Sequence, residues 1–467
     1  MVYTSSVTVR NGTVYGSGLR YDLRLDPMGS VDSLPLDSLI AMEGFSTEVN
    51  YGKSVLISTL ATVGTVGAAV AIACAADPKC FGSCPTVYSD SAGVPVLEAE
   101  AFSYSIAPVF EGRDVDRLRA HPGPDGILRL EIRNEAFETH YLNHLDLLEV
   151  VHATSETVMP GSKGIPLALE DLVEPVRAVD RLGKDRLAEV TTHDGHVFRT
   201  DSSTLAGATA GDLVDYLDLE FPVDVGQDSA VLVFRQRNSL LATVLLYDLM
   251  LGDRGPHAIN WLASDLTRPG PAVALGFWAK SVLGMGVDVW DGERYRPIGR
   301  IPDTGPVAWK DVAFPVPVLS GQTAVRVRLS FPADNWRIDR IALARQWRRP
   351  SVRIIPLTDV LGANEQPNSM VLENLSAADD RYAVSSAGQY FVAVFDTGPE
   401  PAIGRRTFLL GAQGYYLEWI RRTWLETGRE TTAFQPGPAS LFEAIRRWRE
   451  SQDTTERLFS ATRVPVR

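Results

Sequence analysis

The stretch from Val55 to Ala76 reads VLISTLATVGTVGAAVAIACAA and contains neither a charged residue nor a proline. Lys53 precedes it, and Asp77-Pro78-Lys79 follows it. About 20 such residues are enough for a helix to cross a bilayer. We therefore predict a single transmembrane helix over residues 54–76, which separates a short N-terminal segment from a large C-terminal body.

Two other interpretations of this apolar stretch stay open. Its many Ala, Gly and Thr residues make it less apolar than a leucine-rich span, so a buried core helix is one alternative, although core helices are seldom free of charge for so long. The sequence Ala71-Ile72-Ala73-Cys74 is similar to a lipoprotein signal, which would make Cys74 a lipidated residue. Against this, such signals normally stand at the beginning of a chain.

Small residues line one face of the predicted helix. Gly64 and Ala68 are four residues apart, as are Ala69 and Ala73, so each pair shares a face. Small faces allow another transmembrane helix to approach closely. The helix is therefore either a simple anchor or a packing element for integral membrane partners.

The composition is that of a folded protein with several cores. The chain has 467 residues, of which 45% are hydrophobic and 22% are charged, which is enough for about two to four domains. Its net charge of -13 argues against nucleic acid as a partner, because binding to phosphates needs a basic surface.

Three cysteines, Cys74, Cys80 and Cys84, lie in or just after the apolar stretch. In an oxidising compartment we expect Cys80 and Cys84 to close a small disulfide loop, and otherwise to be free thiols. Half of a metal site is a further alternative, but no second cysteine pair completes a set of four ligands.

The orientation of the predicted span is weakly specified, because one lysine lies close to each end. No cleavable signal begins the chain. We expect the N-terminus in the cytoplasm and the large body on the periplasmic or extracellular side of a single-pass membrane protein.

Alternating side-chain patterns predict a mainly β fold. Asn11-Gly12 is typical of a two-residue hairpin turn, and Leu128, Leu130 and Ile132 alternate with charged residues as in a half-buried strand. After the predicted transmembrane helix we expect a multi-domain body of β-sandwich-like units with a few helices. The predicted parts are a small β segment over 1–50, the helix over 54–76, a β domain over 80–160, a mixed α/β segment over 161–270, a β-sandwich over 271–346, and a β unit with a C-terminal helix over 351–467. Within the mixed segment we expect a loop and a short helix over 165–174 and a buried helix over 240–251.

No motif for catalysis or for a cofactor stands out. His140 and His144 are four residues apart, which on a helix would allow them to bind zinc. However, Tyr141 stands where a zinc protease needs Glu, and on a strand the two histidines would lie more than about 10 Å apart. No nucleophile elbow, Walker motif or dinucleotide-binding glycine pattern is present. We therefore predict no catalytic, cofactor-binding or metal-binding residue. We favour a non-enzymatic function over an enzymatic one.

Aromatic residues are frequent near the C-terminus. Two interpretations are open: core packing of the last β unit against the terminal helix, or a contact surface for a protein or a membrane interface, where aromatics and arginines are enriched. The candidate interface residues are Tyr415, Tyr416, Trp419, Trp424 and Trp448.

Three short motifs carry a resemblance: Cys84-Pro85-Thr86-Val87-Tyr88, Glu98-Ala99-Glu100-Ala101-Phe102, and residues 134–141, which read NEAFETHY. Together they resemble a group of uncharacterised bacterial proteins in which a short β segment and one apolar helix precede a Cys-Pro-x-Val-Tyr motif and a large β body. The resemblance covers about residues 1–155 and, more loosely, the rest of the chain. It implies an architecture and no activity.

Two functions follow as hypotheses. The first is a non-catalytic accessory or scaffold subunit of a membrane complex, for example a photosynthetic or respiratory assembly, and wide apolar patches would favour it. The second is a membrane-anchored surface protein that binds or hydrolyses carbohydrate, and a deep cleft with converging carboxylates would favour that. We favour the scaffold, since no catalytic motif is present.

Overall fold

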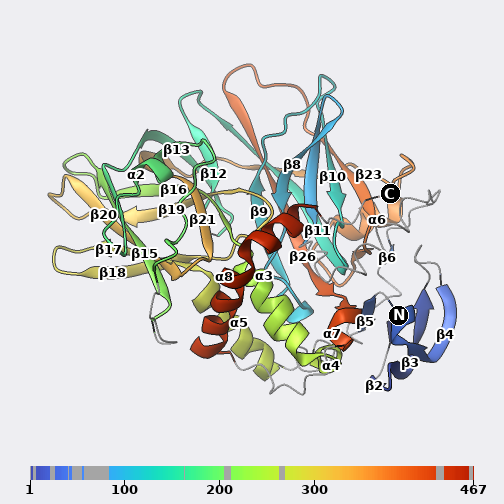
Figure 1. The fold of residues 1–467 in the computed structure, drawn as a ribbon. Coiled ribbons are helices and arrows are strands. Elements are labelled where there is room, and N and C mark those ends of the chain that lie inside the picture. The colour runs from blue at the N-terminus through green and yellow to red at the C-terminus, as the bar shows by residue number, and fades with distance from the viewer. Residues whose placement is uncertain are drawn as a thin grey trace.

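The computed structural model describes residues 2–3, 7–21, 27–39, 41–44, 55–56, 84–161, 163–204, 212–261, 269–426, 436–461 and 466. The fold is mainly β, as the sequence predicts. Four of its five sheets form two β-sandwiches that lie side by side, and helices cover one end of both (Figure 1). The fifth sheet belongs to the N-terminal segment.

The first sandwich is built from two parts of the chain that are separated by about two hundred residues. Its core lies between two sheets that both combine early and late strands. One sheet has the order β23 (Asp359–Leu361), β25 (Tyr390–Asp396), β10 (Ile127–Arg133), β7 (Thr86–Ser91), β8 (Val94–Glu100). The other has the order β6 (Val55–Leu56), β24 (Ala383–Ser385), β11 (Glu138–His152), β26 (Arg405–Glu418), β9 (Gly112–Arg117), with β22 (Arg353–Pro356) also pairing with β11.

The second sandwich is inserted between β11 and β22 of the first. Its two sheets enclose a separate core of alternating apolar residues. One sheet has the order β12 (Thr157–Pro160), β13 (Pro166–Val173), β21 (Trp336–Arg348), β16 (Ser229–Asn238), β19 (Lys310–Pro317). The other has the order β14 (Arg177–Asp180), β15 (Val214–Pro222), β20 (Ala324–Pro332), β17 (Met285–Trp290), β18 (Tyr295–Ile301).

The sheets therefore do not follow the predicted division of the chain. The unit expected over 80–160 pairs with the one expected over 351–467, because β11 and β26 form a long antiparallel ladder. The sandwich expected over 271–346 also takes strands from 161–270. Residues 165–174 were expected to hold a short helix, and this is wrong: β13 forms there, since it is paired on both sides, with β12 and β21.

Helices fill the space at one end of the two sandwiches (Figure 1). The buried helix predicted over 240–251 is confirmed: Ser239 Oγ accepts a hydrogen bond from the Leu241 amide at its start, and its side chains enter a third core. The long helix α8 (Pro438–Ala461) packs on this core through Leu441, Ala444, Ile445 and Trp448, the face predicted from their spacing. The helices of this layer are α3 (Leu241–Val244), its π-helical continuation η3 (Leu245–Leu251), η4 (Gly252–Arg254), α4 (His257–Asn260), α5 (Pro269–Leu283), α7 (Arg422–Glu426) and α8.

The short helices α2 (Leu187–Thr191) and α6 (Ser369–Leu375) lie away from this layer, whereas η2 (Pro108–Phe110) contacts α5 and packs Phe110 on the third core. Of these, α2 contacts β14 and β21 in the second sandwich. It follows β14 directly along the chain, and it forms part of the wall of the site described below.

The N-terminal segment forms the predicted small sheet. Asn11 and Gly12 make the hairpin turn, and both have the positive φ values, 49° and 69°, that such a tight turn requires. The last strand of the sheet comes from the C-terminal part of the chain, so the segment is tied to the body. Its elements are β1 (Val2–Tyr3), β2 (Thr8–Arg10), β3 (Thr13–Tyr21), β4 (Pro27–Pro35), η1 (Leu36–Ser38), β5 (Ala41–Gly44) and β27 (Ile420–Arg421).

Most of the predicted transmembrane helix lies outside the described residues, and so do the small residues Gly64, Ala68, Ala69 and Ala73 and the candidate lipidation site Cys74. The first two apolar residues, Val55–Leu56, form strand β6, which pairs in parallel with β24. The predicted helix is therefore wrong at Val55 and Leu56. In the part of the chain that the structure describes, no helix is both long and apolar enough to cross a membrane.

Ion pairs join the two sandwiches where β9 meets β19. The buried Lys310 ammonium contacts the carboxylates of Asp114 and Asp116, and Arg117 pairs with Asp311 at 3.0 Å. Glu100 accepts hydrogen bonds from two backbone amides of the loop before β19, at residues 307 and 308. These contacts fix the loop whose neighbouring residues form part of the pocket below.

Candidate functional site

A pocket of about 1150 Å³ lies where the ends of β16 and β21 meet helix α8. The sandwich contributes strand ends and loops, and the helix contributes one face. The residues that argue for a binding function here are Arg186, Glu189, His196, Arg199, Asp201, Arg237, Asp334, Arg337, Arg449, Gln452, Glu456 and Phe459.

Three arginines stand in a row across the floor of this pocket. Arg237 on β16 lies directly opposite Arg337 on β21. The antiparallel bridge between Phe198 and Ile338 brings Arg199 to the other side of Arg337. Because neighbouring strands lie about 4.8 Å apart, the backbone segments that carry Arg199 and Arg237 are about 10 Å apart. Cross-strand neighbours share a face, so the three cations face the same space.

Arg337 occupies the centre of the row and is 7% exposed. Its Nη1 donates to the carbonyl oxygens of Asp334 and Trp336, and its Nη2 lies 3.5 Å from Glu456 on α8. Burial lowers the pKa of the Arg337 guanidinium; the Glu456 and Asp334 carboxylates oppose this, and the neighbouring arginines add to it. The cation is thus held in place without full compensation of its charge.

Arg237 is held flat beside Arg337. Its guanidinium lies over the Trp309 ring, 4.9 Å from the centroid, and its Nη1 donates to the Pro306 carbonyl at 2.9 Å. Its buried Nε has no hydrogen-bond partner among the described residues. Burial lowers the pKa of this guanidinium too. Arg199 is exposed and makes no ion pair within the described ranges.

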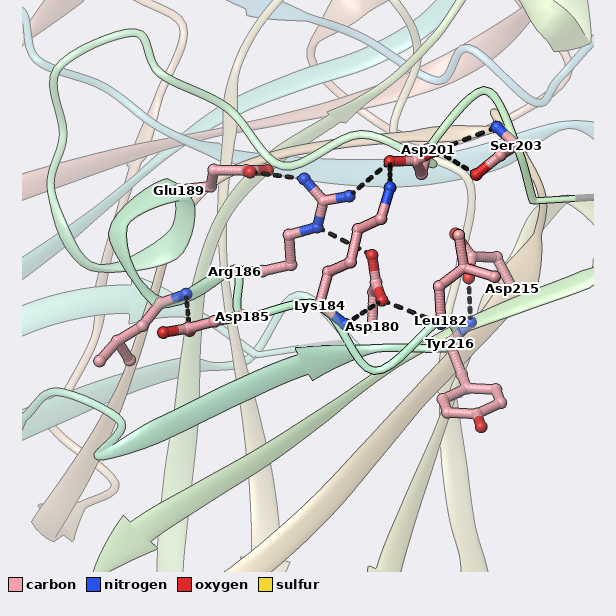
Figure 2. A network of polar contacts seen from close by, with 11 residues as sticks. Asp180, Leu182, Lys184, Asp185, Arg186, Glu189, Asp201, Ser203, Asp215 and Tyr216 are labelled. Atoms are coloured by element: carbon pink, nitrogen blue, oxygen red, sulfur yellow. Dashed lines mark hydrogen bonds and ion pairs between the residues drawn. The ribbon is translucent and has the colours of Figure 1, made fainter.

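The fourth arginine, Arg186, has a structural role. Figure 2 shows its guanidinium between Glu189 and Asp201, with Lys184 also reaching Asp201. Asp180 accepts from its Nε at 2.8 Å. Although burial opposes it, these hydrogen bonds raise the pKa of Arg186. The network ties α2 to the loop at residues 201–203 and so builds one wall of the pocket.

Helix α8 forms the opposite wall. Arg449, Gln452, Glu456 and Phe459 follow each other at three- and four-residue spacing, so they share one helix face. Arg449 pairs with Asp334 at 2.6 Å and donates to the carbonyl of Thr204. Its Nη2 is buried without a hydrogen-bond partner in the described residues.

The pocket is electrostatically distinct from the rest of the chain. Five arginines and four carboxylates line it, so its walls carry one net positive charge in a protein of net charge -13. The carboxylates of Asp201 and Asp334 are engaged by Arg186 and Arg449. The row of Arg199, Arg337 and Arg237 is left with Glu456 as its nearest anion on α8.

The predicted aromatic interface is not on the surface. Tyr415, Tyr416, Trp424 and Trp448 are 6% exposed or less, and they pack in the interior. Trp419 is half-buried, stacks on Phe137 and donates to Thr139 Oγ1 at 2.9 Å. The interface interpretation is therefore corrected to core packing, because both faces of β26 and the inner faces of α7 and α8 are covered by other parts of the fold.

The two histidines of the weighed zinc site lie on one strand, β11, and not on a helix. His140 is buried and bonds to Glu138 at 2.6 Å, whereas His144 bonds to the Leu375 carbonyl. No group of three metal-ligating side chains comes together in the described parts of the chain. Cys84 is buried, and its expected disulfide partner Cys80 lies outside the described residues.

A second polar cluster is buried at the ends of β11 and β26, where the first sandwich meets the helix layer. Glu138 on β11 stands directly opposite Glu418 on β26, and burial raises the pKa of each carboxyl to about 8. Tyr247 donates to Glu418 at 2.8 Å, and Arg421 pairs with it at 2.9 Å. These groups are at most 5% exposed, so the cluster stabilises the fold and has no open path to a ligand.

Sequence reasoning missed the pocket because its arginines are spread from Arg186 to Arg449. The one local signal is Arg235-Gln236-Arg237, which alternates at the end of a strongly apolar strand. A charged pair at the end of a buried strand is common, so this pattern by itself indicates no site.

Comparisons with known proteins give no family. No protein-family profile matches the chain, and no curated protein matches it. An allantoicase structure is 10% identical, with a TM-score of 0.18, over 56% of this chain and 90% of that chain. An uncharacterised protein from Listeria monocytogenes is 13% identical, with a TM-score of 0.15, over 50% of this chain and 22% of that one. A GH31 alpha-xylosidase from Xanthomonas citri is 12% identical, with a TM-score of 0.16, over 70% of this chain and 30% of that chain. Likenesses this weak carry no argument.

Proposed function

We propose that this chain binds an anionic ligand in the pocket between the second sandwich and α8. The observation that carries the proposal is the row of Arg199, Arg337 and Arg237 across three neighbouring strand segments. This is a binding function, in line with the carbohydrate-binding alternative drawn from the sequence, and it needs no catalytic residue.

The physical reason is that the three neighbouring arginines destabilise the folded protein when no ligand is bound. Like charges placed directly opposite each other on neighbouring strands are destabilising. Taking a cation out of water is also costly unless a partner compensates it. An anion that accepts from several guanidinium groups removes both costs, and the planar fork of arginine suits carboxylate, sulfate and phosphate oxygens.

The test is a titration of the full-length protein with inorganic sulfate and phosphate, followed by thermal unfolding and calorimetry. A ligand that binds only the folded state raises the unfolding midpoint in proportion to its concentration. We expect Arg337→Met, which keeps the apolar stem, to weaken binding at least 10-fold. Arg199→Met, at an exposed position, should weaken it without affecting the fold.

The matched control is Arg326→Met on β20. Arg326 is exposed, pairs with Glu220 at 3.0 Å, and is not among the residues that line the pocket. Exposed pairs contribute little to stability. Binding that is equal in all three variants, or no binding by the wild-type protein, contradicts the proposal.

The scaffold subunit remains a second candidate function, and one observation supports it. Helix α5 exposes Val273 and Phe277, four residues apart, with 49% and 72% of their surface accessible. An apolar pair on one helix face suits contact with a membrane-embedded partner. A mild-detergent pull-down of the full-length chain, compared with Phe277→Ser, tests this: an integral membrane partner lost in the variant supports the scaffold, and the absence of such a partner contradicts it.

A further inference from the structure

We infer that the ligand of the arginine pocket is an acidic oligosaccharide, a chain of hydroxylated rings with carboxylates or sulfates on at least two of them. This inference rests on the proposed anion site and adds the class of ligand to it. It follows from the length of the arginine row, from the groups that surround the row, and from the size of the pocket.

The length of the row argues against a single small anion. The guanidinium groups of Arg199, Arg337 and Arg237 originate from three adjacent strand segments, whose outer members are about 10 Å apart. One sulfate or carboxylate has a single cluster of oxygens, which is small compared with the two strand spacings that the row covers. A ligand with anionic groups on successive units can neutralise the central arginine and an outer one together.

The remaining groups argue against a densely charged ligand such as a polyphosphate. Glu456 lies 3.5 Å from the central arginine and is exposed. Its carboxylate repels closely spaced phosphates, whereas it accepts hydrogen bonds from hydroxyl groups. Glu189 lines the same pocket, but its charge is engaged by Arg186. Gln452, which donates to Glu456 at 3.4 Å, and Ser202 offer further partners for hydroxyls on the wall of the pocket.

The size of the pocket fits an oligomer. A volume of about 1150 Å³ exceeds the usual range of small-molecule sites, about 300–1,000 Å³. Leu240, Pro306 and Phe459 also line the pocket, but they are buried, so the accessible wall is formed mainly by polar and charged side chains. Arginine, carboxylate and amide side chains along such a volume match a ligand that is acidic, hydroxylated and several rings long.

The experiment is calorimetry on the full-length protein with five probes: inorganic sulfate, galacturonic acid, a trimer of galacturonic acid, a sulfated trisaccharide, and a neutral trisaccharide. We expect an acidic trimer to bind at least 10-fold more tightly than the acidic monomer, and the neutral trisaccharide to show no binding. Arg237→Met and Arg199→Met should each reduce the advantage of the trimer over the monomer, and Arg326→Met should leave it unchanged. The carboxylated and sulfated trimers then tell which acidic group the site prefers.

Linear tripolyphosphate separates the outcomes. If it binds as tightly as the better acidic trimer, or if monomer and trimer bind equally, the oligosaccharide inference is overturned while the anion site stands. If sulfate and tripolyphosphate bind and no saccharide does, the inference is likewise overturned. If no anion binds at all, both the proposed anion-binding function and the oligosaccharide inference fail.

Discussion

At the scale of single residues, the buried acid pair makes stability depend on pH. Burial raises the pKa of Glu138 and Glu418 from 4.5 to about 8, against the opposing charge of Arg421. The folded state therefore holds protons that the unfolded chain releases above pH 4.5. This contribution is complete below about pH 4.5 and is lost as the pH rises towards 8. His140 acts in the opposite sense, since burial lowers its pKa to about 3 and its contribution is lost as the pH falls below 6.5.

The prediction is that Glu418→Gln makes stability fall less steeply between pH 6.5 and 8, by up to about 1.4 kcal/mol per pH unit, the value for one proton. Glutamine keeps partners for Tyr247 and Arg421. Urea midpoints measured across this range provide the test, with exposed Glu293→Gln as the control. Parallel curves for wild type and Glu418→Gln would show that this carboxyl does not titrate in the range.

Gly411 is a residue that its neighbours require to be glycine. A Cβ there would overlap with both members of the ion pair between Arg113 and Asp146, which crosses over strand β26. We expect Gly411→Ala to destabilise the protein by up to about 1 kcal/mol, because the Cβ displaces the ends of both side chains and breaks a pair whose arginine is partly exposed. The control is Gly270→Ala, where a Cβ meets no atom within 4 Å. Equal unfolding midpoints for the two variants would contradict the prediction.

At the scale of elements, α8 serves both the core and the pocket. Its inner face buries Trp448 completely, and a neighbouring face brings Arg449 and Glu456 to the pocket. Glu456 competes with a small anion for Arg337, from which it lies 3.5 Å away. The binding site therefore exists only as long as the helix is packed on its core.

The prediction for this element is that Glu456→Gln tightens the binding of inorganic sulfate several-fold, since a competing negative charge is removed. Glu450→Gln on the same helix is the control, because Glu450 pairs with Arg446 and does not line the pocket. Calorimetric titrations of both variants with sulfate, compared with the wild-type protein, test this prediction. Weaker or unchanged binding in Glu456→Gln would mean that this carboxylate does not occupy the position of the anion.

At the scale of the whole molecule, Lys310 links the two sandwiches. It is 7% exposed and lies between Asp114 and Asp116 of the other sandwich. Lys310→Met leaves the buried Asp116 and the partly buried Asp114 without their cation, which costs about 3 kcal/mol. Scanning calorimetry should show a lower unfolding midpoint than exposed Lys280→Met, and should show whether the transition splits as the sandwiches separate. A midpoint equal to that of Lys280→Met would show that the junction does not depend on this pair.

Local patterns predicted many elements but not their partners. The Asn11-Gly12 hairpin, strand β10 and the buried helix starting at Leu241 follow from turn chemistry, alternation and capping, which act within a few residues. Strand β13 was missed because a short apolar run does not distinguish a helix from a strand. The aromatic residues near the C-terminus were visible, but only the packing shows that most of them face inward.

The sequence by itself determined a mainly β protein with an acidic charge, several hairpins and an amphipathic C-terminal helix, since these depend on composition and short-range periodicity. Only the tertiary structure decided that β11 pairs with β26, and that Arg199, Arg237 and Arg337 meet beside Arg449. The physical reason is that strand pairing joins residues far apart in the chain. A binding site made from strand ends and a distant helix therefore leaves no spacing in the sequence that could reveal it.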